Sequence, residues 1–108
     1  MDKVILGLTE QVKINGILVK AKIDTGADRS SICKSLIREL NLKPTGKKIK
    51  VKSSHGITLR EIYSAELEIK GKKMITDFNV IDRNNLSYSV LIGNNTLKSH
   101  NFLVDPTQ

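Results

Sequence analysis

The chain has 108 residues, a length that suits one domain with a single hydrophobic core. Its apolar content is mostly aliphatic, because there is no Trp and there are only two Phe and two Tyr. A core built from β-branched residues favours strands. Since aromatic stacking platforms are scarce, binding of nucleic acid is disfavoured.

The positive charge is concentrated in the first half of the chain. Residues 1–54 carry 12 Lys and Arg against 5 Asp and Glu, whereas residues 55–108 carry 6 against 6, for a net charge of +7. Such a field favours anionic partners such as nucleic acid, phosphates or acidic peptides. The alternative is that the lysines keep a small β-domain soluble. Charge alone leaves both interpretations open.

Cysteine usage and terminal composition bear on compartment and cofactors. The single Cys33 excludes an intramolecular disulfide, which is typical of a reducing compartment. The chain lacks the charged and apolar segments of a signal peptide, and no apolar run approaches the ~20 residues of a membrane span. Two distant histidines and one cysteine are a poor set of metal ligands, and no GxxxxGK[ST] phosphate loop is present. We therefore expect a cytoplasmic protein without cofactor, metal or membrane anchor.

In chain order, the first predicted elements are two strands and a helix. Residues 9–23 alternate apolar and polar around Asn15-Gly16, which is the strongest short signal for a hairpin. Residues 33–42, CKSLIRELNL, place apolar side chains on one face just before Pro44. This spacing predicts a short amphipathic helix.

The middle of the chain predicts two more hairpins. Residues 47–52, KKIKVK, alternate again, with the apolar side chains inward and the lysines outward. Residues 53–58, SSHGIT, then predict a polar turn with a mobile tip. Lys70-Gly71 marks the next turn, and residues 73–81 form the strand that follows it.

The last predicted elements complete an all-β chain with one or two short helices. Residues 82–87 are expected to form a loop that leads into a short apolar strand ending at Gly93. A helical turn over residues 94–98 and a closing strand over residues 102–104 follow.

Asp24 stands at the end of an apolar strand and is followed by Thr25 and Gly26. The Thr hydroxyl can brace such a turn, and Gly lets another backbone approach closely. One carboxylate cannot both activate a water and protonate a leaving group, and the chain has no second Asp-Thr-Gly. A second copy related by a two-fold axis would supply the other carboxylate, and the two would share a proton. The alternative is a turn carboxylate that caps nearby amides.

The motif Asp24-Thr25-Gly26-Ala27, with Leu-Ile-Gly at residues 91–93, resembles the retropepsins, the retroviral-type aspartic peptidases that dimerise to assemble one active site. The resemblance covers nearly the whole chain. It implies the closed β-barrel of the acid protease fold, with residues 1–108 as a single domain that supplies half of a two-fold dimeric active site.

Three segments carry a closer resemblance: KAKIDTGA, VKSSHGIT and SVLIGNNTLKSHNFLVDP. They are similar to a cellular retropepsin-like family known as ATP-dependent zinc proteases, often encoded beside ATP-grasp ligases that add glutamates. The residue pattern of that family is the pattern of an aspartic peptidase.

The retropepsin resemblance implies roles for individual residues. Asp24, Thr25 and Gly26 would form the catalytic motif, in which Asp24 is the acid and base and Thr25 ties the two active-site loops together across the dimer. Contacts with the substrate would come from the rest of this loop, from a flap at the tip of the second hairpin and from one cleft residue: Ala27, Asp28, Ser54, His55, Gly56, Ile57 and Leu91.

One position departs from both families. In these families an arginine commonly follows the glycine of the Leu-Ile-Gly motif, and in retropepsins this arginine pairs with an aspartate at the position of Asp28. This chain has Asn94 there, and Arg29 and Arg38 are the candidates to compensate.

The resemblance and the charge together predict a homodimeric aspartic peptidase, acting on acidic or oligo-glutamyl polypeptides. The basic first half and the association with glutamate ligases motivate that choice of substrate. The alternative is a catalytically inactive module of the same fold that binds an extended peptide between two subunits.

Overall fold

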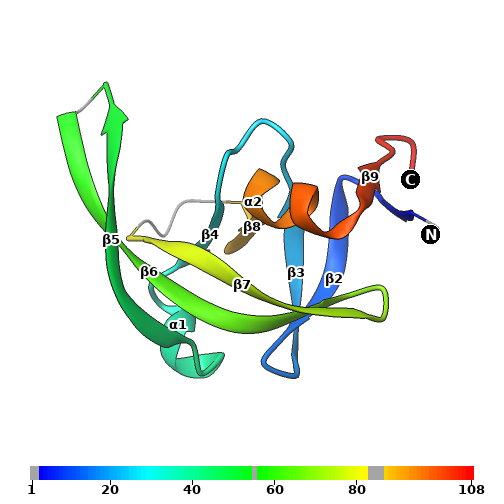
Figure 1. The fold of residues 1–108 in the computed structure, drawn as a ribbon, viewed down its shortest axis with the longest axis horizontal. Helices are drawn as coiled ribbons and strands as arrows, with labels where there is room; N and C mark the ends of the chain where they lie inside the picture. Colours follow the sequence, from blue (N-terminus) through cyan, green and yellow to red (C-terminus); the bar gives the residue numbers. More distant parts are fainter. Residues whose placement is uncertain (1–2, 55, 83–86) are drawn as a thin grey trace.

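The computed structural model describes residues 3–54, 56–82 and 87–108 (Figure 1). Six strands are hydrogen-bonded in the order β2 (Thr9–Ile14), β3 (Ile17–Ile23), β8 (Val90–Ile92), β4 (Ser30–Cys33), β7 (Lys72–Ile81) and β6 (Gly56–Ile69). Because β2 also pairs with β6, the sheet closes into a barrel. The predicted all-β closed barrel is confirmed.

Two tight turns determine how the long strands pair. Asn15 and Gly16 join β2 to β3 with φ angles of 50° and 83°, and Lys70 and Gly71 join β6 to β7 with φ angles of 48° and 82°. Positive φ at both turn residues is the type I′ geometry, whose twist matches that of the flanking strands. Both predicted hairpin turns are confirmed.

Alternate side chains of the barrel strands point inward and form the core. Phe78 on β7 is the largest fully buried side chain. Burying each large apolar side chain contributes about 1.5–3 kcal/mol. Aliphatic side chains from the other barrel strands surround it: Val12, Ile14, Ala21, Ile23, Ile32, Leu67, Ile69, Val90 and Ile92.

The helix predicted over residues 33–42 is mostly wrong. The structure has only the single turn α1 (Leu36–Glu39), and Cys33 instead ends the buried strand β4. Residues of β4 gain ladder hydrogen bonds to both β7 and β8, which a helix could not make. Asn41, with a φ of 56°, then reverses the chain, so that too few residues remain for a longer helix.

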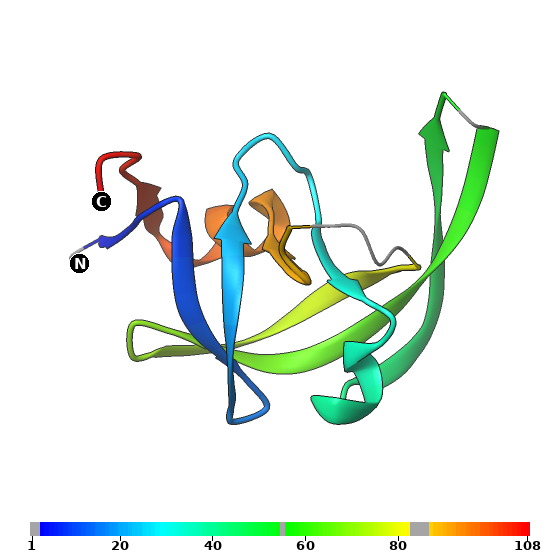
Figure 2. The ribbon, with the colours of Figure 1, turned by 180° about the vertical axis from the view of Figure 1, so that it is seen from behind.

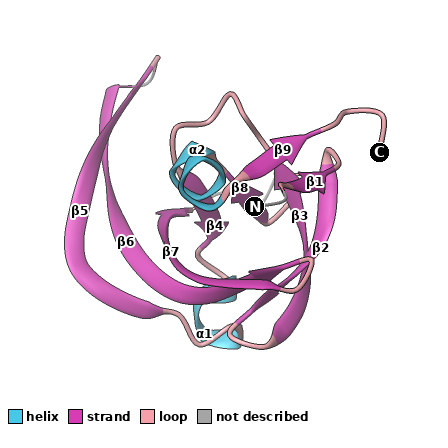
Figure 3. Ribbon diagram, turned by 45° about the vertical axis from the view of Figure 1, so that its right-hand side comes forward, coloured by secondary structure: helices cyan, strands magenta, loops and turns pink. Residues whose placement is uncertain are grey.

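The two chain ends meet at one end of the molecule (Figures 1 and 2). The strand β1 (Val4–Leu6), which the sequence did not predict, pairs in parallel with β9 (Phe102–Val104). The predicted helical turn is present as α2 (Asn94–Leu97), followed by the 3-10 turn η1 (Lys98–His100). Figure 3 shows α1 and α2 at opposite ends of the barrel.

The hairpin of β5 (Lys43–Ser53) and β6 projects from the barrel on the side away from the chain ends (Figure 2). Among the described strands, β5 pairs with β6 alone, and its register shifts between Pro44 and Lys48. Proline is tolerated there because an edge strand leaves its donor side unpaired. Ile49 and Val51 are half-buried, whereas the neighbouring lysines are exposed, as their alternation predicted.

Candidate active site

The turn after β3 holds the Asp24 carboxylate. The Asp24 N–H donates to the Ile92 carbonyl oxygen at 2.9 Å, which extends the strand pairing by one residue. The Gly26 N–H donates to Asp24 Oδ1 at 2.9 Å, and the Ala27 N–H donates to the Asp24 carbonyl oxygen at 3.2 Å. A Cβ atom at Gly26 would lie 3.2 Å from Asp24 Oδ1, so a side chain there would crowd the carboxylate.

The start of α2 fastens this turn to the barrel. The backbone N–H of Asn94 donates to the Ala27 carbonyl oxygen at 2.8 Å, and the N–H of Asn95 donates to the Asp28 carbonyl oxygen at 3.0 Å. The side-chain Nδ2 of Asn94 donates to the Thr25 carbonyl oxygen at 2.8 Å. Hydrogen bonds therefore join the loop that carries the predicted catalytic motif to the residues that follow Leu-Ile-Gly.

Asn94 stands where the resemblance leads one to expect an arginine, and its side chain contacts the Asp24 turn. Among the described residues, neither Arg29 nor Arg38 forms an ion pair with Asp28, so the suggested compensation by these arginines is absent there. The carboxamide of Asn94 holds the turn at Thr25, one residue from Asp24. The bonds of Asn94 to this loop are neutral hydrogen bonds, from its side chain and from its backbone N–H.

Gly93 is required by close packing. A Cβ atom at this position would lie 2.5 Å from the Arg29 carbonyl oxygen and 2.9 Å from the Ala27 carbonyl oxygen. Real side chains do not approach backbone so closely. The glycine of the Leu-Ile-Gly motif is thus the residue that lets the loop of residues 24–29 lie against α2. We call this segment the Asp24 loop.

A buried network of polar side chains connects the end of the Asp24 loop to α2 and β7. Ser30 Oγ lies 2.9 Å from Asn95 Oδ1 and 2.8 Å from Thr96 Oγ1, and it accepts the Gly93 N–H at 3.0 Å. Thr96 Oγ1 in turn lies 2.7 Å from the hydroxyl of Thr76 on β7. Sequence reasoning missed this network, since isolated Ser, Thr and Asn residues carry no pattern that marks them as buried partners.

The predicted flap residues lie at the tip of the β5–β6 hairpin. Ser54 and Gly56 are exposed, and Ile57 is 63% exposed. His55 lies outside the described residues. Gly56 has a φ of 109°, which favours glycine. These described residues are close to one another but do not line the cleft beside Asp28.

That cleft, of about 590 Å³, lies between the Asp24 loop and the β5–β6 hairpin. We call it the basic cleft, because its lining includes four cationic side chains and one carboxylate. It is lined by Ala27, Asp28, Arg29, Ser31, Ile49, Lys50, Val51, Lys52, Arg60 and Asn79. The hairpin thus contributes strand residues just before and after its tip rather than Ser54, Gly56 or Ile57.

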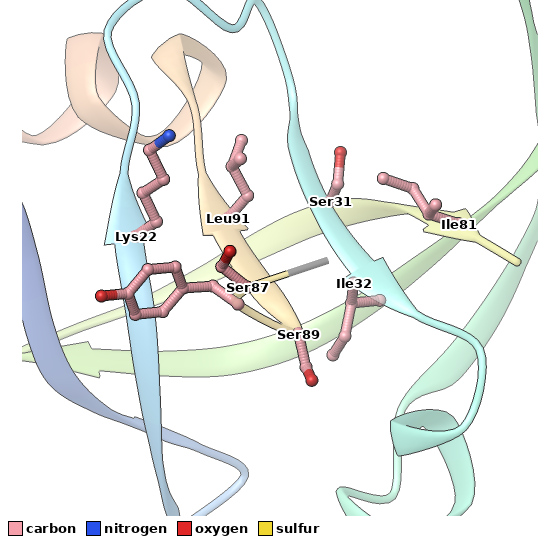
Figure 4. A pocket seen from close by; sticks show the side chains of 8 residues that line it. Lys22, Ser31, Ile32, Ile81, Ser87, Ser89 and Leu91 are labelled. Carbon is pink, nitrogen blue, oxygen red and sulfur yellow. The ribbon is translucent and has the colours of Figure 1, made fainter. Parts of the chain in front are cut away.

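A second pocket, of about 390 Å³, shares Ser31 with the basic cleft (Figure 4). We call it the Leu91 pocket. Its lining is Lys22, Ser31, Ile32, Ile81, Ser87, Tyr88, Ser89 and Leu91. Leu91 is paired with Lys22 on one side and with Ser31 on the other, so the three project from one face of the sheet. Alternation places Asp24, two residues after Lys22, on this same face.

The other chemically interesting side chains are separate from this site. The Nδ1 atom of His100 lies 3.1 Å from the Thr96 carbonyl oxygen at the end of η1, and Cys33 is buried in β4. In residues 3–54, 56–82 and 87–108, no three His, Cys, Asp or Glu side chains come together as a metal site. No helix in those ranges is both long and apolar enough to cross a membrane.

The chain is similar to proteases in both sequence pattern and fold. Residues 10–99 match the family model described as "gag-polyprotein putative aspartyl protease". No curated protein sequence matches the chain. Among solved structures, the Legionella pneumophila protein Lpg0085, of unknown function (DUF785), is 19% identical with a TM-score of 0.74, covering 99% of this chain and 96% of that one.

Two retroviral enzymes share the fold. The simian foamy virus (mac) protease is 18% identical with a TM-score of 0.64, covering 83% of this chain and 91% of its own. The EIAV protease, in complex with the inhibitor HBY-793, is 22% identical with a TM-score of 0.66, covering 84% of this chain and 85% of its own. At these identities the similarity concerns the fold. The retropepsin-like fold is confirmed, whereas membership of the cellular zinc-protease family stays a prediction.

Proposed function

Because the chain belongs to the family of gag-polyprotein aspartyl proteases, we propose that it is an aspartic peptidase in which Asp24 activates the attacking water. The observation that carries this proposal is the position of the Asp24 carboxylate. It stands at the end of β3, accepts the Gly26 N–H at 2.9 Å, and lies in a loop that hydrogen bonds hold to the start of α2. A turn carboxylate that only capped amides would also accept the Gly26 N–H, so the bonds that hold the loop to α2 are what favour the proposal.

The active site is assembled from two copies of the chain. Only one Asp-Thr-Gly is present in the sequence, so the second carboxylate comes from a partner related by a two-fold axis. Thr25 is exposed, and within the described part of the chain its hydroxyl makes no hydrogen bond, while its carbonyl oxygen accepts from Asn94. The hydroxyl can therefore bond to the partner's loop, which supports the role implied for Thr25.

The reaction needs one proton shared between the two carboxylates. The ionised Asp24 takes a proton from a bound water as the water oxygen attacks the peptide carbonyl carbon, and the protonated Asp24 of the partner protonates the carbonyl oxygen. The tetrahedral diol then breaks its C–N bond. The leaving nitrogen receives a proton from the first carboxylate, and the second carboxylate recovers a proton from a diol hydroxyl. The pair returns to its starting state with one shared proton.

The surroundings of Asp24 favour an acidic or oligo-glutamyl polypeptide as substrate. The basic cleft offers Arg29, Lys50, Lys52 and Arg60 beside the single carboxylate of Asp28. Cationic side chains gathered in a cleft concentrate anionic chains there and speed their association, an effect that falls with ionic strength. The neighbouring Leu91 pocket could take an apolar side chain of the same extended peptide.

The test compares the wild type with Asp24→Asn on a mixed set of peptides that includes oligo-glutamates. Mass spectrometry detects the products, and sedimentation measures the oligomeric state. We expect the variant to remain a dimer and to lose at least ~100-fold in cleavage rate, since it loses the general base. Cleavage that persists in the variant would rule the proposal out. A dimer that binds peptides and never cleaves them would establish the inactive peptide-binding module instead.

A further inference from the structure

Arg60 reaches the basic cleft from β6, and neighbouring residues fix its position. It is half-buried, and it lies on the same face of β6 as Ile62, which is paired with Asn79 on β7. The Nη1 atom of Arg60 donates to Asn79 Oδ1 at 3.2 Å. Arg60 and Asn79 both line the cleft.

Asn79 is itself held in one orientation. Only 4% of its surface is exposed, and its Nδ2 donates to the Ser30 carbonyl oxygen at 3.0 Å. Its Oδ1 accepts from Arg60 and lies 3.3 Å from Ser31 Oγ. Because the amide nitrogen must face the carbonyl, the oxygen must face Arg60. Asn79 thus links the Arg60 guanidinium to Ser30 on β4. Ser30 is in turn hydrogen-bonded to residues at the start of α2.

On the premise of the proposed function, we propose that Arg60 selects a carboxylate side chain of the substrate in the basic cleft and that Asn79 positions it. A guanidinium has five N–H donors in a rigid plane, so a hydrogen bond to Asn79 is compatible with further hydrogen bonds from the same group. A carboxylate matches this fork in shape and charge and can bind it through two parallel hydrogen bonds. An amide of the same size, as in Gln, cannot supply the charge.

This selectivity differs from general attraction by positive charge. Lys50 and Lys52 are exposed, and solvent and salt screen exposed ammonium groups, which attract anionic chains without regard to the order of their residues. Arg60 is half-buried and fixed, so its interaction depends on one substrate side chain at one place. The chain would thus distinguish Glu from Gln at that place rather than merely prefer acidic peptides.

Binding is measured in the Asp24→Asn background, where turnover does not interfere. The probes are a fluorescein-labelled oligo-glutamate and an oligo-glutamine of equal length, followed by fluorescence polarisation. We expect Arg60→Gln to lower the preference for oligo-glutamate by about 10-fold or more, as for the loss of a charged hydrogen bond. The matched control is Arg38→Gln, which removes the same charge from exposed α1, outside the cleft, and should change the preference less than about twofold.

Arg60→Lys separates geometry from charge and still reports if Arg60→Gln does not fold. It keeps the charge but not the planar fork, and we expect it to recover only part of the preference. Equal losses from Arg60→Gln and Arg38→Gln, or full recovery by Arg60→Lys, would overturn the inference in favour of net charge.

Cleavage by otherwise wild-type protein separates this inference from the proposed function. If Asp24-dependent cleavage has the same Glu over Gln preference with and without Arg60, the peptidase stands and the selectivity of Arg60 falls. If no cleavage occurs but binding still depends on Arg60, the carboxylate site stands and the peptidase falls.

Discussion

The Asp24 loop and the tip of the β5–β6 hairpin both carry predicted site residues, but they are held in different ways. The loop is bonded through backbone and side chain to residues 92–95, and a glycine is needed to let it lie there. The hairpin beyond the barrel is held by the pairing of its own two strands. Ile57 and Leu59 near its tip are 63% and 59% exposed.

Under the proposed function, this difference suits two separate tasks. A carboxylate that activates water must keep its position, since small displacements of a catalytic group reduce the rate strongly. A hairpin that covers a substrate must be able to open, so it is drawn from the less stable part of a fold. Substitutions at Gly93, Asn94 and Gly56 test this difference between the loop and the hairpin.

The largest effect is expected from Gly93→Ala. The new Cβ would meet the Arg29 carbonyl oxygen at 2.5 Å, so the Asp24 loop must move away from α2. We expect a loss of about 1–3 kcal/mol in unfolding free energy, as for overpacked sites. Peptide cleavage should fall by at least ~100-fold because Asp24 moves with the loop. Thermal unfolding and a cleavage assay measure the two.

The matched control is Gly46→Ala. Gly46 has a φ of 82° but open space around it, so alanine there costs about 1 kcal/mol of backbone strain without displacing the loop. Cleavage should be unchanged. Wild-type cleavage by Gly93→Ala would show that the loop does not depend on this close packing.

A smaller effect is expected from Asn94→Ala. The substitution removes the bond from Nδ2 to the Thr25 carbonyl oxygen and leaves the two backbone bonds of the segment in place. We expect a stability loss of about 1 kcal/mol and a roughly 10-fold lower rate of cleavage, since the bond lies next to Asp24.

Ser99→Ala is the control for this variant. It removes a side-chain bond to the Asn95 carbonyl oxygen from the same helical segment, away from the loop. It should cost similar stability and no activity. If both variants cleave equally well, Asn94 has only a structural role.

The smallest effect on global stability is expected from Gly56→Ala, which strains a residue with a φ of 109° at the hairpin tip. We expect less than about 1 kcal/mol in unfolding free energy, because the tip packs on little else. Hydrogen exchange should accelerate at residues 48–53 and 57–61 and stay unchanged at residues 90–95. Equal protection of the two regions in the wild type would show that the hairpin tip and the Asp24 loop do not differ in local stability.

Local signals accounted for much of the fold. Asn15-Gly16 and Lys70-Gly71 adopt the predicted turns because their conformational preferences act within a few residues. The closing strand over residues 102–104 was also predicted from its own residues. Cys33 was misplaced in a helix because its strand exists only through pairing with β7 and β8, which the helical spacing of its neighbours does not reveal.

The sequence by itself determined the Asp-Thr-Gly turn, the alternation of the long strands and the two hairpins, since each depends on residues close together in the chain. Only the tertiary structure decided how the site is supported. Ser30 and Thr96 are 66 residues apart, and Ser31 and Asn79 are 48 apart, yet each pair is in contact. Closure of the barrel creates these contacts, together with the position of Arg60 in its cleft. Single polar residues carry no local signal of a distant partner, so chain order could not predict them.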